Sequence, residues 1–312
     1  DYVRAVEKKN ISENISKVLY PNDNIHLGKV LRLQQEYFFV SATLQDIFAA
    51  WKQDHDNFTD LPEKVAIQLN DTHPALVIPE MMRILIDEEQ LDFETAWDIT
   101  RQCCSYTNHT ILPEALEKWS VKLFEELLPR HLMLIYQINE HIMNQVIQLY
   151  PGNIDKMRNL SIIEEGPEKK IRMAQLCLHG THTVNGVAEL HTRILKERIF
   201  PDFYEMYPER FQNKTNGITP RLWLRTCNPQ LASLITEHIG ESWVANLDYI
   251  RGIEQYAKDQ EFLDEFLEIK EINKRELTRY IFKTTGIRVR QDSIFSSQIK
   301  RIHEYKRQLL NA

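Results

Sequence analysis

The chain has 312 residues, of which 43% are hydrophobic and 27% charged, a composition typical of a globular protein with a sizeable core. Its length favours two domains. The formal net charge of −7 argues against a general nucleic-acid-binding or membrane-binding surface, so an anion would have to bind at a local basic cluster. No apolar run approaches the roughly 18 residues of a membrane-spanning helix, and no signal peptide is recognisable, so we expect a cytoplasmic protein.

The cysteines agree with a reducing compartment. Cys103 and Cys104 are adjacent, Cys177 and Cys227 stand alone in apolar surroundings, and none belongs to a C-x-x-C pair. This pattern predicts buried free thiols rather than disulfides or a metal site.

Helical periodicity occupies much of the first 150 residues. The spacing of apolar residues predicts helices at residues 1–19, 31–51, 92–107, 113–128 and 130–150. The Pro/Asn/Asp cluster at residues 20–24 predicts a turn between the first two helices.

Two stretches read as a strand, a polar turn and a helix. Residues 64–70 alternate in the manner of a strand and continue through Asp71 into a helix predicted at 75–87. The apolar run 173–178 reads as a second strand, which would feed a helix through a turn containing His182. Because open α/β sheets bind ligands at the carboxyl ends of their strands, both turns are candidate sites. A plain alternative is that His182 is a satisfied polar side chain at a helix start.

The remaining stretches set the domain organisation. Residues 160–163 predict a short strand, and the charged segment 164–170 predicts a hairpin or a loop tip. Gly186, inside the helix predicted after His182, indicates a close approach by a neighbouring group. The turn-forming run 213–220 is the predicted domain boundary.

Beyond the boundary, residues 221–283 read as helical and heavily charged, with Gly286 as the C-cap of the last helix. Residues 293–300 are a strand candidate, and another helix is predicted after them.

A basic cluster follows that candidate strand. Residues 300–307 contain four cations, Lys300, Arg301, Lys306 and Arg307, and one carboxylate, a local charge of +3. A strand end that turns into a helix also supplies free backbone N–H groups, so the cluster predicts an oxyanion site. A solvated charged face is the alternative interpretation.

Other common kinds of site have no support in the sequence. His179 and His182 lack a thiolate or carboxylate at a usual ligand spacing, so no metal site is predicted. There is no G-x-S-x-G nucleophile elbow, no G-x-G-x-x-G and no Walker A motif.

The order of the motifs resembles one family. YPNDN, LNDTHPA, YTNHT with LPEALEKW, LPRH, GTHTVNGVAELH, NKTNGITPRLW and IKRIHEYKRQLLN follow one another as in the α-glucan (glycogen, starch, maltodextrin) phosphorylases. The chain is similar to the central part of such an enzyme. The resemblance implies an α/β fold of the GT-B kind, with two Rossmann-like domains facing across a cleft, both incomplete here. Residues 1–216 would be part of the N-terminal domain, with 1–19 as a dimer-contact helix, and 217–312 would begin the C-terminal, cofactor-binding domain.

The same resemblance implies the reaction and its partners. The family cleaves a terminal α-1,4-linked glucose from a glucan with inorganic phosphate, giving glucose 1-phosphate with retention of configuration. It is a glycosyltransferase of glycogen and carbohydrate metabolism, often allosteric, homodimeric and cytoplasmic, and needs no nucleic acid, membrane or metal. Its cofactor is pyridoxal phosphate, whose Schiff-base lysine would lie outside these residues, so we expect the isolated chain to be inactive.

Site residues are implied by motif. His182 resembles the histidine that holds the transferred glucosyl unit, with Asp71 as its neighbour and orienter. Arg301 and Lys306 resemble the clamp on the substrate phosphate, and Trp223 and Lys300 resemble groups lining the cofactor pocket. The implied sugar or glucan contacts are Asp23 and Asn24 in a gate loop, together with Asp71, His73, Asn216 and Tyr305.

Three departures from the family pattern leave these groups in place. Ile25 replaces an aromatic residue of an inhibitor site, Leu222 replaces an arginine, and Ser296 and Ser297 stand where an acidic residue is usual. Two alternatives remain open: a nucleotide-sugar glucosyltransferase of the same fold, and a non-catalytic fragment able only to associate.

Overall fold

The computed structural model describes residues 1–297 and residue 299, and it divides the chain into two compact units. The first is Asp1–Asn216 and the second begins at Gly217. Each unit has a hydrophobic core of its own. Among the described residues, no helix is both long and apolar enough to cross a membrane. The division falls inside the turn-rich run 213–220, while the assignment of the units to two Rossmann-like domains stays a prediction.

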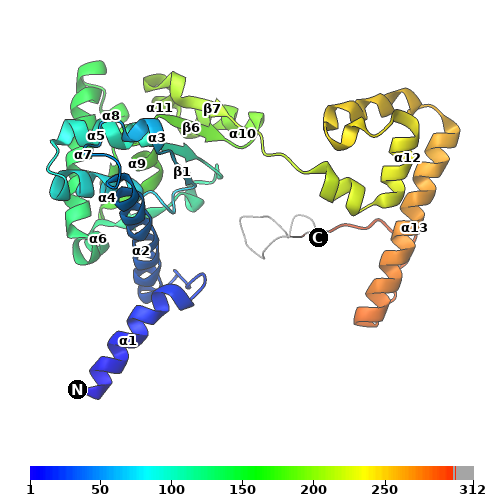
Figure 1. Ribbon diagram of the computed structural model, residues 1–312, viewed down its shortest axis with the longest axis horizontal. Coiled ribbons are helices and arrows are strands. Elements are labelled where there is room, and N and C mark those ends of the chain that lie inside the picture. The colour runs from blue at the N-terminus through cyan, green and yellow to red at the C-terminus, as the bar shows by residue number, and fades with distance from the viewer. Residues whose placement is uncertain (298, 300–312) are drawn as a thin grey trace. The chain divides into compact units, whose positions relative to one another are not determined.

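The first unit is a mixture of helices and short strands (Figure 1). In chain order these are α1 (Tyr2–Lys17), α2 (His26–Trp51), α3 (Leu61–Lys64), β1 (Ile67–Asn70), α4 (Val77–Arg83), η1 (Ile84–Glu88), α5 (Phe93–Cys103), β2 (Cys104–Thr107), η2 (Pro113–Ala115), β3 (Lys118–Ser120), α6 (Val121–Leu127), α7 (Pro129–Leu149), α8 (Ile154–Leu160), β4 (Ile163–Glu164), β5 (Lys170–Arg172), α9 (Met173–His179), β6 (Thr183–Gly186), α10 (Glu189–Ile194), η3 (Leu195–Ile199), α11 (Pro201–Met206), η4 (Pro208–Arg210) and β7 (Phe211–Asn213).

The centre of this unit is a parallel sheet with the order β1-β2-β6-β7. Asn70 stands opposite Thr107, and Thr107 opposite Asn185, so the carboxyl ends of β1, β2 and β6 lie at one edge. A separate antiparallel sheet has the order β3-β5-β4, and residues 165–169 of the charged segment connect β4 to β5, as predicted for a hairpin tip. The predicted α/β class is therefore confirmed.

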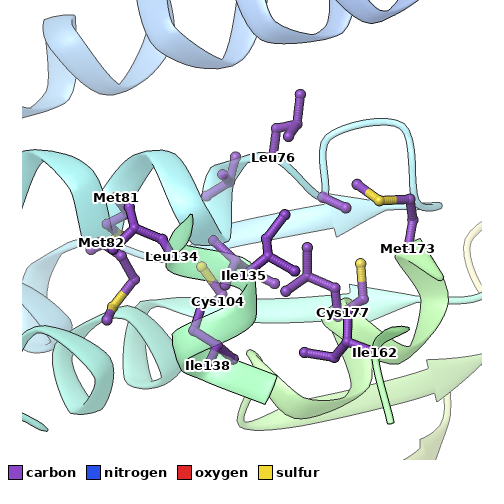
Figure 2. Close-up of a cluster of buried hydrophobic side chains, with 14 of the residues drawn as sticks. Leu76, Met81, Met82, Cys104, Leu134, Ile135, Ile138, Ile162, Met173 and Cys177 are labelled. Carbon is purple, nitrogen blue, oxygen red and sulfur yellow. The ribbon is translucent and has the colours of Figure 1, made fainter. Parts of the chain in front are cut away.

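One face of the parallel sheet packs against the main core. Figure 2 shows Cys104 of β2 in one buried cluster with side chains of α4, α7 and α9. Leu69, Tyr106 and Val184 also point to this face and are buried. Alternation along the strands therefore places polar residues on the other face.

The apolar run 173–178 is a helix, not the predicted strand. It forms α9, and the true strand β6 follows it, at residues that were predicted to begin a helix. Met173, Leu176 and Cys177 are fully buried, and a short run that is buried on all sides looks the same in sequence whether it is strand or helix.

Three other boundaries differ from the predictions. The helix predicted at 92–107 ends at Cys103, and the last four residues form β2. The helix predicted at 113–128 is interrupted by β3, because Trp119 pairs with Ile171 across an antiparallel ladder. The strand predicted at 160–163 begins only at Ile163, because Leu160 still belongs to α8.

Buried polar side chains complete the end of α9. Arg210, only 9% exposed, donates from Nη1 to the carbonyl oxygens of Leu178, His179 and Thr181, at 3.4, 3.3 and 3.2 Å. Its guanidinium also lies over the ring of Tyr207, 3.7 Å from the centroid. Carbonyl groups that a helix terminus leaves without partners are thereby satisfied.

The second unit, in the residues that the structure describes, has helices as its only regular elements. It contains η5 (Arg221–Thr226), α12 (Pro229–Ile239), η6 (Ser242–Val244), η7 (Leu247–Tyr256) and α13 (Gln260–Thr285). Trp243, 1% exposed, packs with Ala232 and Ile235 in its core. Gly286 ends α13 with a φ of 75°, as predicted for a C-cap. The strand predicted at 293–300 is absent from the described positions in that range.

Candidate active site at the carboxyl edge of the parallel sheet

Asp71 turns the chain sharply at the end of β1. Its φ is 68°, a conformation that Asp tolerates better than most residues. The Asp71 N–H donates to the Thr107 carbonyl at 3.0 Å, and Asp71 Oδ1 accepts from the Thr72 N–H at 2.7 Å. The turn brings Asp71 to the carboxyl edge half-buried and leaves the neighbouring His73 exposed.

The end of β2 brings a second histidine to the same edge. His109 follows β2 by two residues, is exposed, and is hydrogen-bonded through Nε2 to Asn70 Oδ1 at the end of β1. His109 was not among the predicted site residues, although it lies in the YTNHT motif. The missed signal is the strand itself: had 104–107 been read as a strand, His109 would have occupied the same kind of turn as Asp71.

Side chains on the polar face of the sheet are joined by hydrogen bonds that run toward this edge. Ser105 Oγ donates to Gln68 Oε1 at 2.5 Å, and Gln68 Nε2 donates to Thr107 Oγ1 at 2.8 Å. Thr107 Oγ1 in turn donates to Asn185 Oδ1 at 2.8 Å. These bonds join β1, β2 and β6, so the edge is built on ordered side chains rather than on loops alone.

Asn216 reaches the edge from the chain that leaves β7. Its N–H donates to the Val187 carbonyl at 2.9 Å, and the Lys214 N–H donates to the Gly186 carbonyl at 3.1 Å. The Asn216 residue is exposed. The structure thus places it next to the end of β6, on the same edge as Asp71 and His109.

The predicted gate residues lie just before α2 and are anchored there by Arg32. Arg32 Nη1 donates to Asp23 Oδ2 at 2.5 Å, and the same guanidinium binds Glu36 at 3.2 Å and Glu117 at 3.4 Å. Burial raises the pKa of both Glu36 and Glu117. The exposed Asn24 is held by its N–H, which donates to Asn22 Oδ1 at 3.1 Å.

His182 does not lie at this edge. It precedes β6, and its N–H donates to the Cys104 carbonyl at 3.0 Å, at the amino ends of β2 and β6. Its Nδ1 is 2.8 Å from Thr183 Oγ1, and the residue is exposed. The predicted placement at a carboxyl end is therefore wrong, and so is the expected neighbourhood with Asp71. Both errors follow from reading α9 as a strand.

Of the predicted cofactor and phosphate residues, the structure describes one. Trp223 lies on η5 of the second unit with 62% of its surface exposed, so its indole can stack on a planar ring such as a pyridine. Lys300, Arg301, Tyr305 and Lys306 lie outside the described residues. Within the described part of the chain, no group of three or more His, Cys, Asp or Glu side chains is placed to hold a metal ion.

The edge as a whole suits a ligand rich in hydroxyl groups. A carboxylate, two exposed imidazoles and an amide, from Asp71, His73, His109 and Asn216, offer both donors and acceptors within one strand-end region. None of these side chains brings an apolar surface, and the net charge they carry is low.

Comparison with known proteins covers the whole chain. The family model for carbohydrate phosphorylases matches residues 1–312. The muscle form of glycogen phosphorylase from Bos taurus is 54% identical over 318 residues, covering 99% of this chain, and that from Homo sapiens is 53% identical over the same share. The brain form from Homo sapiens is 52% identical over 319 residues and covers 100% of the chain. The chain spans 38% of the length of each of these relatives. With its full length matched by the family model, this chain belongs to the carbohydrate phosphorylase family.

Proposed function

We propose that this chain is the central part of an α-1,4-glucan phosphorylase. The observation that carries the proposal is the 52–54% identity to muscle and brain glycogen phosphorylases across the chain. The hydroxyl-binding character of the carboxyl edge supports it. Under this proposal, the unit Asp1–Asn216 is part of an N-terminal Rossmann-like domain, and the unit from Gly217 begins the C-terminal one.

The reaction is phosphorolysis with retention. The bond between the anomeric carbon of the terminal glucose and its glycosidic oxygen breaks, and this oxygen takes up the proton of the substrate phosphate and leaves with the shortened glucan. An oxygen of the deprotonated phosphate then bonds to the anomeric carbon. The products are glucose 1-phosphate and a glucan one unit shorter. Because water at the anomeric carbon would give hydrolysis, the site has to exclude it.

We assign the sugar-facing histidine to His109 and not to His182. His109 and Asp71 share the carboxyl edge, and the bond to Asn70 fixes the His109 ring. In this role His109, Asp71 and Asn216 bind sugar hydroxyls and hold the glucosyl unit while positive charge develops at its anomeric carbon. His73 would meet the acceptor side, and Asn24 would meet a sugar hydroxyl from the loop anchored by Arg32.

Phosphate and cofactor belong to the second unit in this proposal. Arg301 and Lys306 would clamp the substrate phosphate with Tyr305 beside the sugar, while Trp223 and Lys300 would line the pocket of pyridoxal phosphate. The cofactor supplies a phosphate group that acts in acid–base chemistry beside the substrate phosphate. Cations fixed in a dry cleft bind such an anion strongly, because a low dielectric strengthens the attraction.

The test is release of glucose 1-phosphate from a linear α-1,4-glucan and inorganic phosphate by the full-length enzyme. Lys306→Met removes the charge but keeps most of the side chain, and we expect activity to fall by about 10²–10³-fold. Residues 1–312 alone should release none. Glucosyl transfer from a nucleotide sugar without phosphate would support the alternative glucosyltransferase, and an unimpaired Lys306→Met enzyme would contradict the assigned clamp.

We also propose a cytoplasmic homodimer in which α1 lies at the subunit contact. All residues of α1 are at least partly exposed, including the apolar Tyr2, Val3 and Ile11. An isolated helix of this length gains little stability from its own sequence, so a partner surface would account for its apolar side chains. Val6→Glu with Ile11→Glu should shift sedimentation of the full-length enzyme to the monomer, whereas Glu7→Lys serves as the control. A dimer that survives the double substitution contradicts this contact.

A further inference from the structure

A chain of side-chain hydrogen bonds links the buried Tyr106 and Asn108 to the half-buried His191, next to the loop that carries His109. Asn108, 0% exposed, donates from Nδ2 to the Tyr106 hydroxyl at 3.0 Å. Asn108 Oδ1 lies 3.1 Å from His191 Nε2 and also accepts from the Thr110 N–H at 3.0 Å. His191 Nδ1 accepts from the Val187 N–H at 3.0 Å. The chain thus runs from β2 through Asn108 to the start of α10.

The hydrogen-bond partners of His191 determine which of its two ring nitrogens carries the proton. A backbone N–H can only donate, so the Nδ1 atom facing Val187 carries no proton. The proton of the neutral imidazole is therefore on Nε2, and it is donated to Asn108 Oδ1. Burial, and after it the nearby His109, lowers the pKa of His191, which agrees with a neutral ring. A proton on Nδ1 would set two donors against each other.

The hydrogen bonds of Asn108 and His191 also determine the position of His109. The Asn108 N–H donates to the Asn185 carbonyl at 3.0 Å, which extends the pairing of β2 with β6 by one residue, and His109 is the next residue along. From the β1 side, Asn70 binds the His109 ring. The His109 backbone is therefore held by Asn108, and Asn108 by His191, on the side away from Asn70.

We infer that His191 is a positioning residue of this site, whose neutral imidazole holds Asn108 and, through it, the backbone that presents His109 to the sugar. The catalytic consequence rests on the proposed function. The placement of the His109 ring does not, and it can be measured separately. Displacing a substrate-binding group by about 1 Å can cost up to 10²-fold in rate, so the holding network matters even though it does not touch substrate.

The first measurement uses the unmodified chain. In ¹⁵N-labelled protein at pH 7, the imidazole shifts of His191 should show a neutral ring protonated at Nε2. A ring protonated at Nδ1, or a doubly protonated ring, would overturn the inference without any variant.

The second measurement compares His191→Leu with His191→Gln. Leu removes both hydrogen bonds, whereas Gln keeps a donor and an acceptor on one side chain. In the Leu variant the His109 ring signals should shift and kcat of the full-length enzyme should fall about 10- to 100-fold, with KM within about twofold. Gln should restore most of both. A Leu variant that is less stable yet keeps wild-type His109 signals has lost only structural support, and this result overturns the proposal.

The two proposals fail in different ways. If His109→Ala leaves phosphorolysis intact, the role assigned to His109 in the proposed function is wrong. The His109 signals in the Leu and Gln variants still decide whether His191 positions it. Should the His191→Leu variant not fold, Asn108→Leu in its place removes the Oδ1 acceptor of the His191 N–H at nearly constant size, and unchanged His109 signals there would equally contradict the inference.

Discussion

The two edges of the parallel sheet carry histidines in very different settings. At the carboxyl edge, His109 shares the strand-end region with Asp71 and is hydrogen-bonded to Asn70. The residue before it, Asn108, is hydrogen-bonded to His191. At the amino edge, His182 is hydrogen-bonded to Thr183 Oγ1 and to the Cys104 carbonyl, and within the described residues no carboxylate is paired with it. Polar side chains from several strands therefore meet at the carboxyl edge but not at the amino edge. A candidate site is distinguished by this meeting of side chains, and a histidine within a family motif is not sufficient.

The largest effect that separates the edges is catalytic. In the full-length enzyme, His109→Ala should lower kcat by about 10²-fold, the usual loss for one preorganised contact at a developing charge. His182→Ala, our matched control at the other edge, should change kcat by less than about threefold. Glucose 1-phosphate release at saturating phosphate measures both. The reverse ranking would restore the original assignment of His182 and contradict the one made from the structure.

A smaller effect concerns how the carboxyl edge is packed. A Cβ on Gly186 would lie 2.4 Å from Thr192 Oγ1 and 2.9 Å from Thr192 Cα, within α10. Gly186→Ala should therefore lower the free energy of unfolding by about 2 kcal/mol, measured with urea. Gly217→Ala is the control, because no atom of the described residues lies within 4 Å of its added Cβ. Equal stabilities for the two variants would show that β6 and α10 do not approach as described.

The smallest expected effect is a pH dependence of the free energy of unfolding that is caused by His179. His179 ends α9, donates from Nε2 to the Leu160 carbonyl at 2.8 Å, and burial lowers its pKa to about 3. The unfolded chain binds a proton near pH 6.5 and the folded chain does not, so stability is full above pH 6.5 and is lost as pH falls. His179→Gln should reduce the drop in unfolding free energy between pH 7 and pH 5.5 by about 1 kcal/mol. An unchanged drop would mean that His179 is protonated in the folded state.

The sequence supported the long elements and the first strand well. The helices predicted at 31–51 and 130–150 appear as α2 and α7, and the strand predicted at 64–70 contains β1. These segments have clear periods because one face is buried and the other is not. The run at 173–178 shows no helical or strand periodicity in its apolar residues, because α9 is buried on almost all sides. Predicting this run as a strand placed His182 at the wrong edge of the sheet.

The site was predictable only in part for the same physical reason. Asp71 and His73 follow a strand that alternates visibly, so their position could be inferred. His109 follows β2, whose Cys104 and Tyr106 are buried while Ser105 and Thr107 are partly exposed, a weak alternation at the end of a long helical pattern. The supporting bonds from Asn70 and His191 join residues 39 and 83 positions apart, which no local pattern reports.

The hydrogen bonds of Arg210 to the end of α9 can form only late during synthesis of this region. Its partners at the end of α9 are made 29 to 32 residues earlier, and at roughly 5–20 residues per second a ribosome needs about two to six seconds to reach Arg210 after them. Until then the last carbonyls of α9 lack their cation, and β6 lacks β7 beside it. The nascent protein therefore passes through a stage in which β6 is an open edge, and a nonsense mutation between residues 187 and 209 would leave that edge open permanently, as a template for aggregation.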